Sequence, residues 1–247
     1  MRTRICPVCG GECKPDQNGE YVCGCCGNTL EGEYAPVTRM SASADDGERV
    51  FDVAKNAVVE LKCSFGTKAC SGSGYMITDD GYCVTNTHVV TDSATYAAAR
   101  GVTAKIAGES VAATVIALGD DRGGRGRGID LALIRLARVP RGAQKVTMGD
   151  FKDVRNGQTV YVVGNSLGMG TCITKGIVSD RQRLIEGDVL LMTDCAINPG
   201  NSGGPMFDSS ARVIGTIVSG IDNAEGMNFA IPVDDVKTFL RKAGLRF

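Results

Sequence analysis

Short apolar runs rich in valine, isoleucine and threonine recur along the chain from about residue 58, and glycine-containing turns separate them. Alternation of apolar and polar positions is typical of half-buried β-strands. The runs predict strands at 58–63, 74–78, 82–85, 95–106, 111–117 and 129–136, and then at 158–164, 171–178, 189–196, 204–208, 212–219 and 226–231. The pattern therefore predicts an all-β fold, in two units of about 90 residues each.

Two segments follow a helical period instead. A short helix is expected at 46–57, and a second one, ended by Gly244, at 234–243. Residues 31–45 follow neither period and are rich in alanine and serine, which is typical of a linker. The linker separates a cysteine-rich module at 1–30 from the β-rich remainder.

Charge and hydropathy exclude some classes of partner. The 247-residue chain has a net charge of −1, so no overall field would attract nucleic acid or an anionic membrane. No apolar run approaches the roughly 18 residues that span a bilayer, and no apolar leader follows the basic start of the sequence. These features predict a cytoplasmic protein that binds neither nucleic acid nor membrane.

The strongest signal for chemistry is the octapeptide Asn-Pro-Gly-Asn-Ser-Gly-Gly-Pro at 198–205. A serine hydroxyl becomes a good nucleophile only when a base removes its proton, and it needs backbone N–H groups directed at the developing oxyanion. Glycines around Ser202 let the backbone turn sharply and approach a substrate closely. We therefore expect Ser202 to be a nucleophile, with N–H groups of Gly200 and Ser202 directed into one oxyanion hole.

His88 is the one histidine of the chain. Histidine suits a general base near neutral pH, so a histidine that activates Ser202 can only be His88. Asp130 lies in an apolar strand pattern, where a carboxylate needs a partner, and the His88 imidazole would provide one. Asp194 and Asp92 compete for this orienting role. The chain order His, Asp, Ser is that of the chymotrypsin-type fold and not that of subtilisins or α/β-hydrolases.

Residues 46–243 resemble the protease domain of the HtrA (Deg) branch of trypsin-like serine peptidases. The matching stretches are 72–90, 130–134, 193–205, 213–215 and 226–232. The resemblance implies a protease domain at 46–247, with one six-stranded antiparallel barrel at about 57–140 and another at about 150–232, and with the active site between them.

The same resemblance implies the roles of residues around the nucleophile. Asn201 would lie between the two oxyanion N–H groups of Gly200 and Ser202. The substrate pocket would be formed by Ala196, Ile197, Val218, Ser219 and Gly220. Because Ala196 is small and neutral, we expect cleavage of protein or peptide substrates after small or medium aliphatic residues. No cofactor is required for such catalysis.

Departures from the family pattern concern its partners. The sequence leaves no room after Phe247 for a PDZ domain, so no PDZ ligand is expected. In relatives the N-terminal segment helps to build trimers, but here a cysteine-rich module precedes it, so a homotrimer is one option for the assembly.

Six of the 11 cysteines lie between Cys6 and Cys26. Cys6-x-x-Cys9 and Cys23-x-x-Cys26 have the spacing of a closed four-thiolate Zn²⁺ site, so residues 1–30 are expected to form a zinc ribbon with structural Zn²⁺. Cys25 or Cys13 could replace one of the ligands, and a redox-active or disulfide-linked cluster is the alternative.

Two other functions compete with an active endopeptidase. In one, the protease fold is a weak or inactive binding module that acts together with its zinc ribbon. In the other, the ribbon is a redox or zinc sensor that gates the protease. The presence of all three triad residue types favours the endopeptidase.

Overall fold

The computed structural model describes residues 4–5, 12–15, 17, 21–23, 29–30, 46–119, 128–185, 187–220 and 226–246. The chain divides into two compact units, Met1–Ser43 and Ala44–Phe247, each described here by itself.

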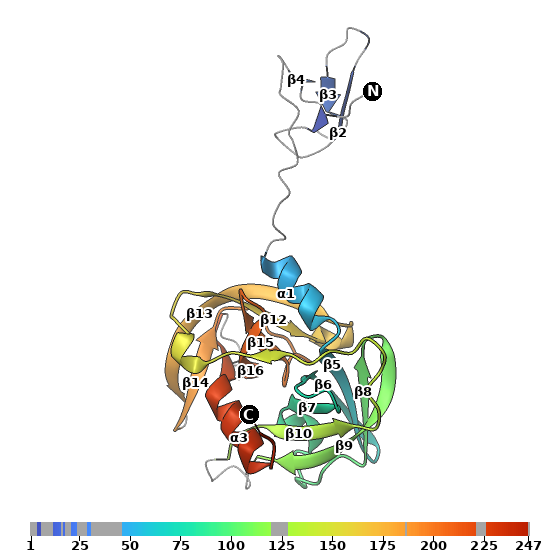
Figure 1. The fold of residues 1–247 in the computed structure, drawn as a ribbon, viewed down its shortest axis with the longest axis vertical. Coiled ribbons are helices and arrows are strands. Elements are labelled where there is room, and N and C mark those ends of the chain that lie inside the picture. The colour runs from blue at the N-terminus through green and yellow to red at the C-terminus, as the bar shows by residue number, and fades with distance from the viewer. Residues whose placement is uncertain are drawn as a thin grey trace. The chain divides into compact units, whose positions relative to one another are not determined.

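The first unit contains a four-stranded antiparallel sheet in the order β1-β2-β3-β4 (Figure 1). Its strands are β1 (Arg4–Ile5), β2 (Glu12–Pro15), β3 (Tyr21–Cys23) and β4 (Thr29–Leu30). Cys13 lies opposite Cys23 in the register of β2 and β3. Three predicted zinc ligands, Cys6, Cys9 and Cys26, and the side chain of Cys23 lie outside the described residues, so the zinc site stays a prediction.

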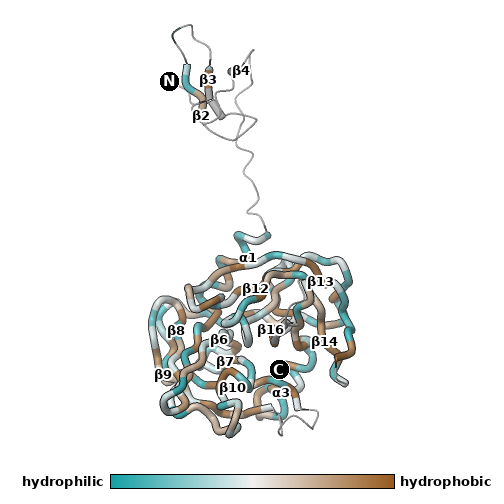
Figure 2. The backbone as a smooth tube through the Cα atoms, turned by 180° about the vertical axis from the view of Figure 1, so that it is seen from behind, coloured by the Kyte–Doolittle hydropathy of each residue, from teal (hydrophilic) through white to brown (hydrophobic). Residues whose placement is uncertain are grey.

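The second unit begins with a closed barrel of six strands in the order β10-β7-β6-β5-β8-β9. Its strands are β5 (Val58–Phe65), β6 (Lys68–Met76), β7 (Tyr82–Thr85), β8 (Gly101–Ile106), β9 (Glu109–Leu118) and β10 (Ala132–Leu136). Exposed and buried residues alternate strictly along β8, as expected for a strand with one face in a core. Figure 2 shows the corresponding mixture of hydrophilic and hydrophobic positions along the strands.

Six further strands form a second ring. They are β12 (Thr159–Gly164), β13 (Cys172–Ile185), β14 (Asp188–Thr193), β15 (Pro205–Asp208), β16 (Arg212–Gly220) and β17 (Asn228–Pro232). They pair in the order β16-β15-β12-β13-β14-β17, and the pairing of β16 with β17 closes the ring. β11 (Thr147–Met148) adds to β16 in parallel. The predicted all-β fold is confirmed.

The helices are short. They are α1 (Asp46–Ala54), α2 (Thr87–Val90) and α3 (Val233–Lys242), with two 3₁₀ turns, η1 (Phe151–Asp153) and η2 (Ser166–Gly168). The predicted C-terminal helix is thus confirmed as α3, which buries Val236, Phe239 and Leu240. Among the helices in the described ranges, none has the length and apolar character that crossing a membrane requires.

Several predicted strands begin later than expected, and the strand expected at 95–106 shows the largest delay. The expected strand at 95–106 starts only at Gly101. The carboxylate of Asp92 accepts hydrogen bonds from the N–H groups of Ala94 and Thr95, at 3.0 and 2.9 Å. Such side-chain bonds to nearby backbone favour a turn over an extended strand.

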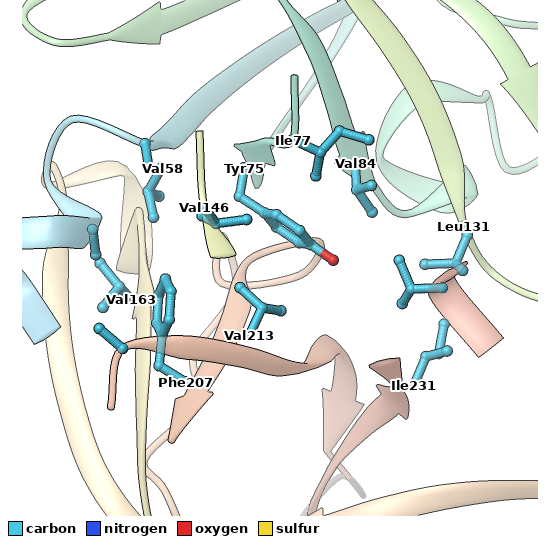
Figure 3. Close-up of a cluster of buried hydrophobic side chains, with 14 of the residues drawn as sticks. Val58, Tyr75, Ile77, Val84, Leu131, Val146, Val163, Phe207, Val213 and Ile231 are labelled. Carbon is cyan, nitrogen blue, oxygen red and sulfur yellow. The ribbon is translucent and has the colours of Figure 1, made fainter. Parts of the chain in front are cut away.

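The largest apolar cluster joins the two barrels. It includes Tyr75 and Leu131 from the first barrel and Phe207 and Ile231 from the second, and Figure 3 shows the Tyr75 ring among these side chains. The Tyr75 hydroxyl shares a 2.7 Å hydrogen bond with the Thr216 hydroxyl, and both residues are fully buried. Burial raises the pKa of Tyr75, so its hydroxyl stays protonated. The two barrels therefore share one apolar core.

Removing that hydroxyl is expected to weaken the junction. Tyr75→Phe leaves the buried Thr216 hydroxyl without its partner, which should lower the free energy of unfolding by about 1–3 kcal/mol. Urea denaturation should show a lower midpoint at an unchanged m-value. Tyr96→Phe, at an exposed tyrosine, is the control and should have no measurable effect. Equal midpoints for Tyr75→Phe and wild type would show that this bond contributes nothing.

Candidate active site

His88 lies on the single turn of α2, directly after β7. Val89 and Val90 are buried in the first barrel, and the Thr87 hydroxyl donates a 2.7 Å hydrogen bond to the Leu131 carbonyl. These contacts fix the turn from the core side. The His88 side chain remains 46% exposed.

Asp130 holds His88 with both carboxylate oxygens. One oxygen forms a 2.6 Å hydrogen bond with the imidazole Nδ1, and the other accepts a 3.0 Å hydrogen bond from the His88 backbone N–H. The Asn86 amide donates to the Asp130 carbonyl at 2.7 Å, which fixes the backbone of the aspartate. A carboxylate partner at Nδ1 selects the tautomer in which Nδ1 carries the proton, so Nε2 is left as a base.

The two competing acids have other partners. Asp92 caps the turn at Ala94 and Thr95, and Asp194 accepts the N–H of Ile177 at 2.7 Å. The sequence pattern predicted Asp130 inside a strand, but Asp130 lies just before β10. Its position at the strand end places the carboxylate beside α2.

Ser202 lies in the nucleophile loop, residues 198–204, between β14 and β15. The loop is closed by a hydrogen bond from the Asn201 N–H to the Asn198 carbonyl at 3.0 Å. The Ser202 hydroxyl donates to the Val218 carbonyl at 2.9 Å. Among the residues that the structure describes, no hydrogen bond joins it to His88. Catalytic hydrogen bonds are often misaligned in free enzymes and form only with substrate.

The backbone of the nucleophile loop determines where its N–H groups point. In a trans peptide the N–H and C=O groups point in opposite directions, and the described part of the chain contains no cis peptide. The Pro199 carbonyl accepts the Leu167 N–H at 2.7 Å, so the Gly200 N–H points away from Leu167. The Asn201 carbonyl accepts a hydrogen bond from the Gly204 N–H at 2.9 Å, so the Ser202 N–H of the same peptide points away from Gly204.

The predicted pocket residues are described only in part. Ala196 is exposed, and Ile197 and Val218 are half-buried. The Ser219 side chain and the burial of Gly220 lie outside what the structure describes. Asn228, which the sequence reasoning did not single out, donates from its amide to the Cys195 carbonyl at 2.8 Å and so fixes the backbone just before Ala196.

A cavity of about 250 Å³ lies on the Asp130 side of the site. Its lining includes Ile129, Asp130, Asp188, Val218 and Asp235. Burial, together with the nearby carboxylates of Asp234 and Asp188, raises the pKa of Asp235 above its usual value. Three of the residues that line this cavity are aspartates, whereas the pocket predicted near Ala196 has no charged residue.

Sequence reasoning missed the residues that support the nucleophile loop. Ser73 and Leu167 hydrogen-bond to the loop from outside it, and Asn165 donates to the Ser73 hydroxyl. The Gly-Ser-Gly run at 72–74 was the one signal, because glycines on both sides of a polar residue indicate a close approach of two backbones.

Comparison with known proteins supports the family. The model of the trypsin-like peptidase domain matches residues 72–215. A "Probable periplasmic serine endoprotease DegP-like" of Brucella suis biovar 1 (strain 1330) is 38% identical over 172 residues, which are 67% of this chain and 31% of the relative. A protein with the same description from Pseudomonas putida (strain W619) is 34% identical over 182 residues, 70% of this chain and 35% of the relative. The chain spans about a third of the length of these relatives.

Solved structures show the same fold. The "HtrA-type protease AlgW with tripeptide" superimposes with a TM-score of 0.67 at 26% identity and covers 79% of this chain and 63% of its own. A serine endoprotease from Yersinia pestis gives a TM-score of 0.66 at 24% identity, with 79% and 65% covered, and supports the fold alone.

The relatives also correct one prediction and settle the family. A cytoplasmic location is contradicted, because these relatives are named periplasmic. The prediction failed because it rested on not finding an apolar leader. Not finding a leader is no positive evidence for any compartment. The chain belongs to the family of the trypsin-like peptidase domain, and it is similar to serine endoproteases of the DegP and HtrA type.

Proposed function

We propose that this domain hydrolyses peptide bonds in protein substrates through a triad of His88, Asp130 and Ser202. The observation that carries the proposal is the two-point contact between Asp130 and His88, because a carboxylate at Nδ1 favours the tautomer in which Nε2 can act as a base. A cofactor is not needed, because each proton and charge in the reaction has a protein group to receive it.

The steps follow from these groups. The Ser202 hydroxyl leaves the Val218 carbonyl and passes its proton to Nε2 of His88, while its oxygen attacks the substrate carbonyl carbon. The N–H groups of Gly200 and Ser202 stabilise the resulting oxyanion. His88 then protonates the leaving amine, which yields an acyl-enzyme, and water releases the acid by the same sequence.

The substrate side chain before the cleaved bond is proposed to be small or medium aliphatic. Ala196 presents a methyl group and Ile197 an alkyl chain, and neither carries a charge that would pair with lysine or arginine. One of the solved relatives was obtained with a tripeptide, which shows that this fold accepts short peptides in that protein.

A fluorophosphonate probe tests the proposal, because it reacts only with a serine whose proton a base removes. We expect one adduct per chain, located by peptide mapping on Ser202. The orientation of the Ser202 hydroxyl toward Val218 favours one alternative, a protease-fold binding module without turnover. Folded protein that remains unlabelled would support that alternative and contradict the endopeptidase.

The N-terminal module is proposed to be a zinc ribbon. Ile5 and Cys23 end their strands at the same end of the described sheet, as the pairs Ile5–Glu12 and Cys13–Cys23 show. The chain therefore enters both Cys-x-x-Cys segments from one end of the sheet. Two such segments that start close together suit a shared tetrahedral Zn²⁺. The assembly state, including a trimer, remains a prediction from the family resemblance.

Metal analysis of the full chain tests the ribbon. We expect about one zinc per chain, lost when Cys6→Ser and Cys9→Ser are combined, because a four-thiolate site cannot close without them. Cys70→Ser, in a half-buried position of the first barrel, is the control and should keep the zinc. Folded protein without zinc, in which Cys6, Cys9, Cys23 and Cys26 are all alkylated, would contradict the site. A loss of peptidase activity on chelation would indicate that the ribbon gates the protease.

A further inference from the structure

Ser73 lies in β6 of the first barrel and makes four hydrogen bonds across or beside the junction with the second barrel. Its N–H donates to the Ser202 carbonyl at 2.8 Å, and its hydroxyl donates to the Gly200 carbonyl at 2.6 Å. The same hydroxyl accepts the Asn165 N–H at 2.8 Å, and the Ser73 carbonyl accepts the Thr85 hydroxyl at 2.7 Å. The Ser73 side chain is fully buried, so bulk water does not compete for these bonds.

The nucleophile loop needs such support from outside. Gly200 and Gly203 have φ angles of +101° and +83°, and Gly204 follows them. Glycine has more accessible backbone conformations than any other residue, so the loop's own sequence does not select one of them. An oxyanion hole made of glycine-rich backbone therefore depends on neighbours that hold its carbonyl groups.

Ser73 contacts peptide groups next to the two N–H groups of the proposed oxyanion hole. The Gly200 carbonyl belongs to the peptide directly after the Gly200 N–H, and the Ser202 carbonyl to the peptide directly after the Ser202 N–H. Ser73 holds both carbonyls. The peptides before these two N–H groups are held separately, through the Pro199 and Asn201 carbonyls. Each oxyanion N–H is thus fixed from both sides, and one residue of the other barrel supplies half of that restraint.

The packing around Ser73 leaves it little freedom. A Cβ atom added to Gly203 would lie 2.3 Å from the Ser73 carbonyl oxygen, and one added to Gly164 would lie 2.9 Å from its hydroxyl oxygen. A Cβ atom at Gly72, next in the chain, would lie 3.3 Å from the Ser202 carbonyl oxygen. The backbones of the two barrels therefore meet at van der Waals distance around this one hydroxyl.

We propose that Ser73 is a positioning residue that keeps the oxyanion hole formed by holding the Gly200 and Ser202 carbonyls from the first barrel. The proposal rests on the proposed peptidase function of Ser202. Ser73 does not touch the reacting atoms; it acts through the loop. Because its hydroxyl also accepts the Asn165 N–H, it couples the turn that begins at Asn165 to the same hole.

The test compares a transition-state analogue with a ground-state ligand. A peptide boronic acid with an aliphatic residue next to boron forms a tetrahedral adduct with Ser202 that uses the oxyanion hole, whereas a cleaved product peptide does not. For Ser73→Ala we expect the boronate inhibition constant and kcat to worsen on the order of 10- to 100-fold. The dissociation constant of the product peptide and KM should change by no more than about 3-fold. Ser73→Cys, which retains a weak donor, should recover part of the loss.

Tyr75→Phe is the matched control, because it removes a buried hydroxyl from the same strand that contacts Thr216 and not the nucleophile loop. Hydrogen exchange of a peptide covering 196–206 should quicken in Ser73→Ala and not in Tyr75→Phe. Boronate binding by Ser73→Ala equal to that of wild type, or losses equal to those of Tyr75→Phe, would overturn the proposal. If wild type binds neither boronate nor fluorophosphonate, the peptidase function itself fails. Unchanged exchange in Ser73→Ala would then also rule out its ordering role.

Discussion

Ser202→Ala should lower kcat/KM for an unfolded protein such as casein by about 10⁴-fold or more, to the background of the assay. The variant lacks the oxygen that attacks the substrate, whereas the Asp130–His88 pair and the loop backbone do not depend on it. The fold should persist, because the hydroxyl contributes a single hydrogen bond, to the Val218 carbonyl. The free energy of unfolding is therefore expected to change by no more than about 1 kcal/mol.

The comparison requires equal zinc content and equal folding in both proteins. Urea denaturation tests whether both proteins are equally folded. Rates of casein cleavage measured over a range of casein concentrations give kcat/KM. Residual cleavage above a few per cent in Ser202→Ala would point to another nucleophile or to a contaminating protease. A wild type as slow as Ser202→Ala would favour the binding module.

Asp130→Asn should have the second largest effect, again about 10⁴-fold on kcat. The amide retains the shape of the carboxylate, but its NH₂ group would face the His88 backbone N–H or Nδ1. An amide nitrogen near Nδ1 selects the tautomer with the proton on Nε2, which is the wrong one for a base. The negative charge that stabilises the imidazolium is also lost.

Asp92→Asn is the matched control, because the contacts described for Asp92 are with its own turn and with Lys68, at 3.9 Å. It should leave kcat unchanged and affect stability alone. Partial rescue of Asp130→Asn at high pH, where hydroxide assists proton removal, would agree with the assigned role. An Asp130→Asn variant with wild-type kcat would show that another acid orients His88.

Much of the fold follows from patterns in the sequence. Alternating apolar positions predict most strands, and the segments that carry Ser202 and His88 are marked by their residue types and chain order. Two features could not be found in this way. β6 begins at Lys68, within a polar run that has no apolar alternation, because its pairing with β5 rather than its own pattern makes it a strand. β13 extends to Ile185 through arginine, glutamine and aspartate, since its outer part is held by β14.

The site shows the same division. The sequence indicates which residues carry the chemistry, because a nucleophile and a base must be of particular types. It does not indicate Ser73, since a serine between two glycines has many roles and this one arises only where two barrels meet. Nor does it show that the Ser202 hydroxyl donates to the Val218 carbonyl, which depends on the rotation of one side chain.

Capture of the acyl-enzyme is the most direct check on the central role of Ser202. The wild type would be mixed with an activated ester of an aliphatic acid, quenched with acid within the first turnover, and weighed intact by mass spectrometry. One acyl group per chain, mapped to Ser202 and missing from Ser202→Ala, is the result expected. Ester hydrolysis by the wild type without any covalent adduct, or an adduct on a different residue, would contradict the proposed mechanism.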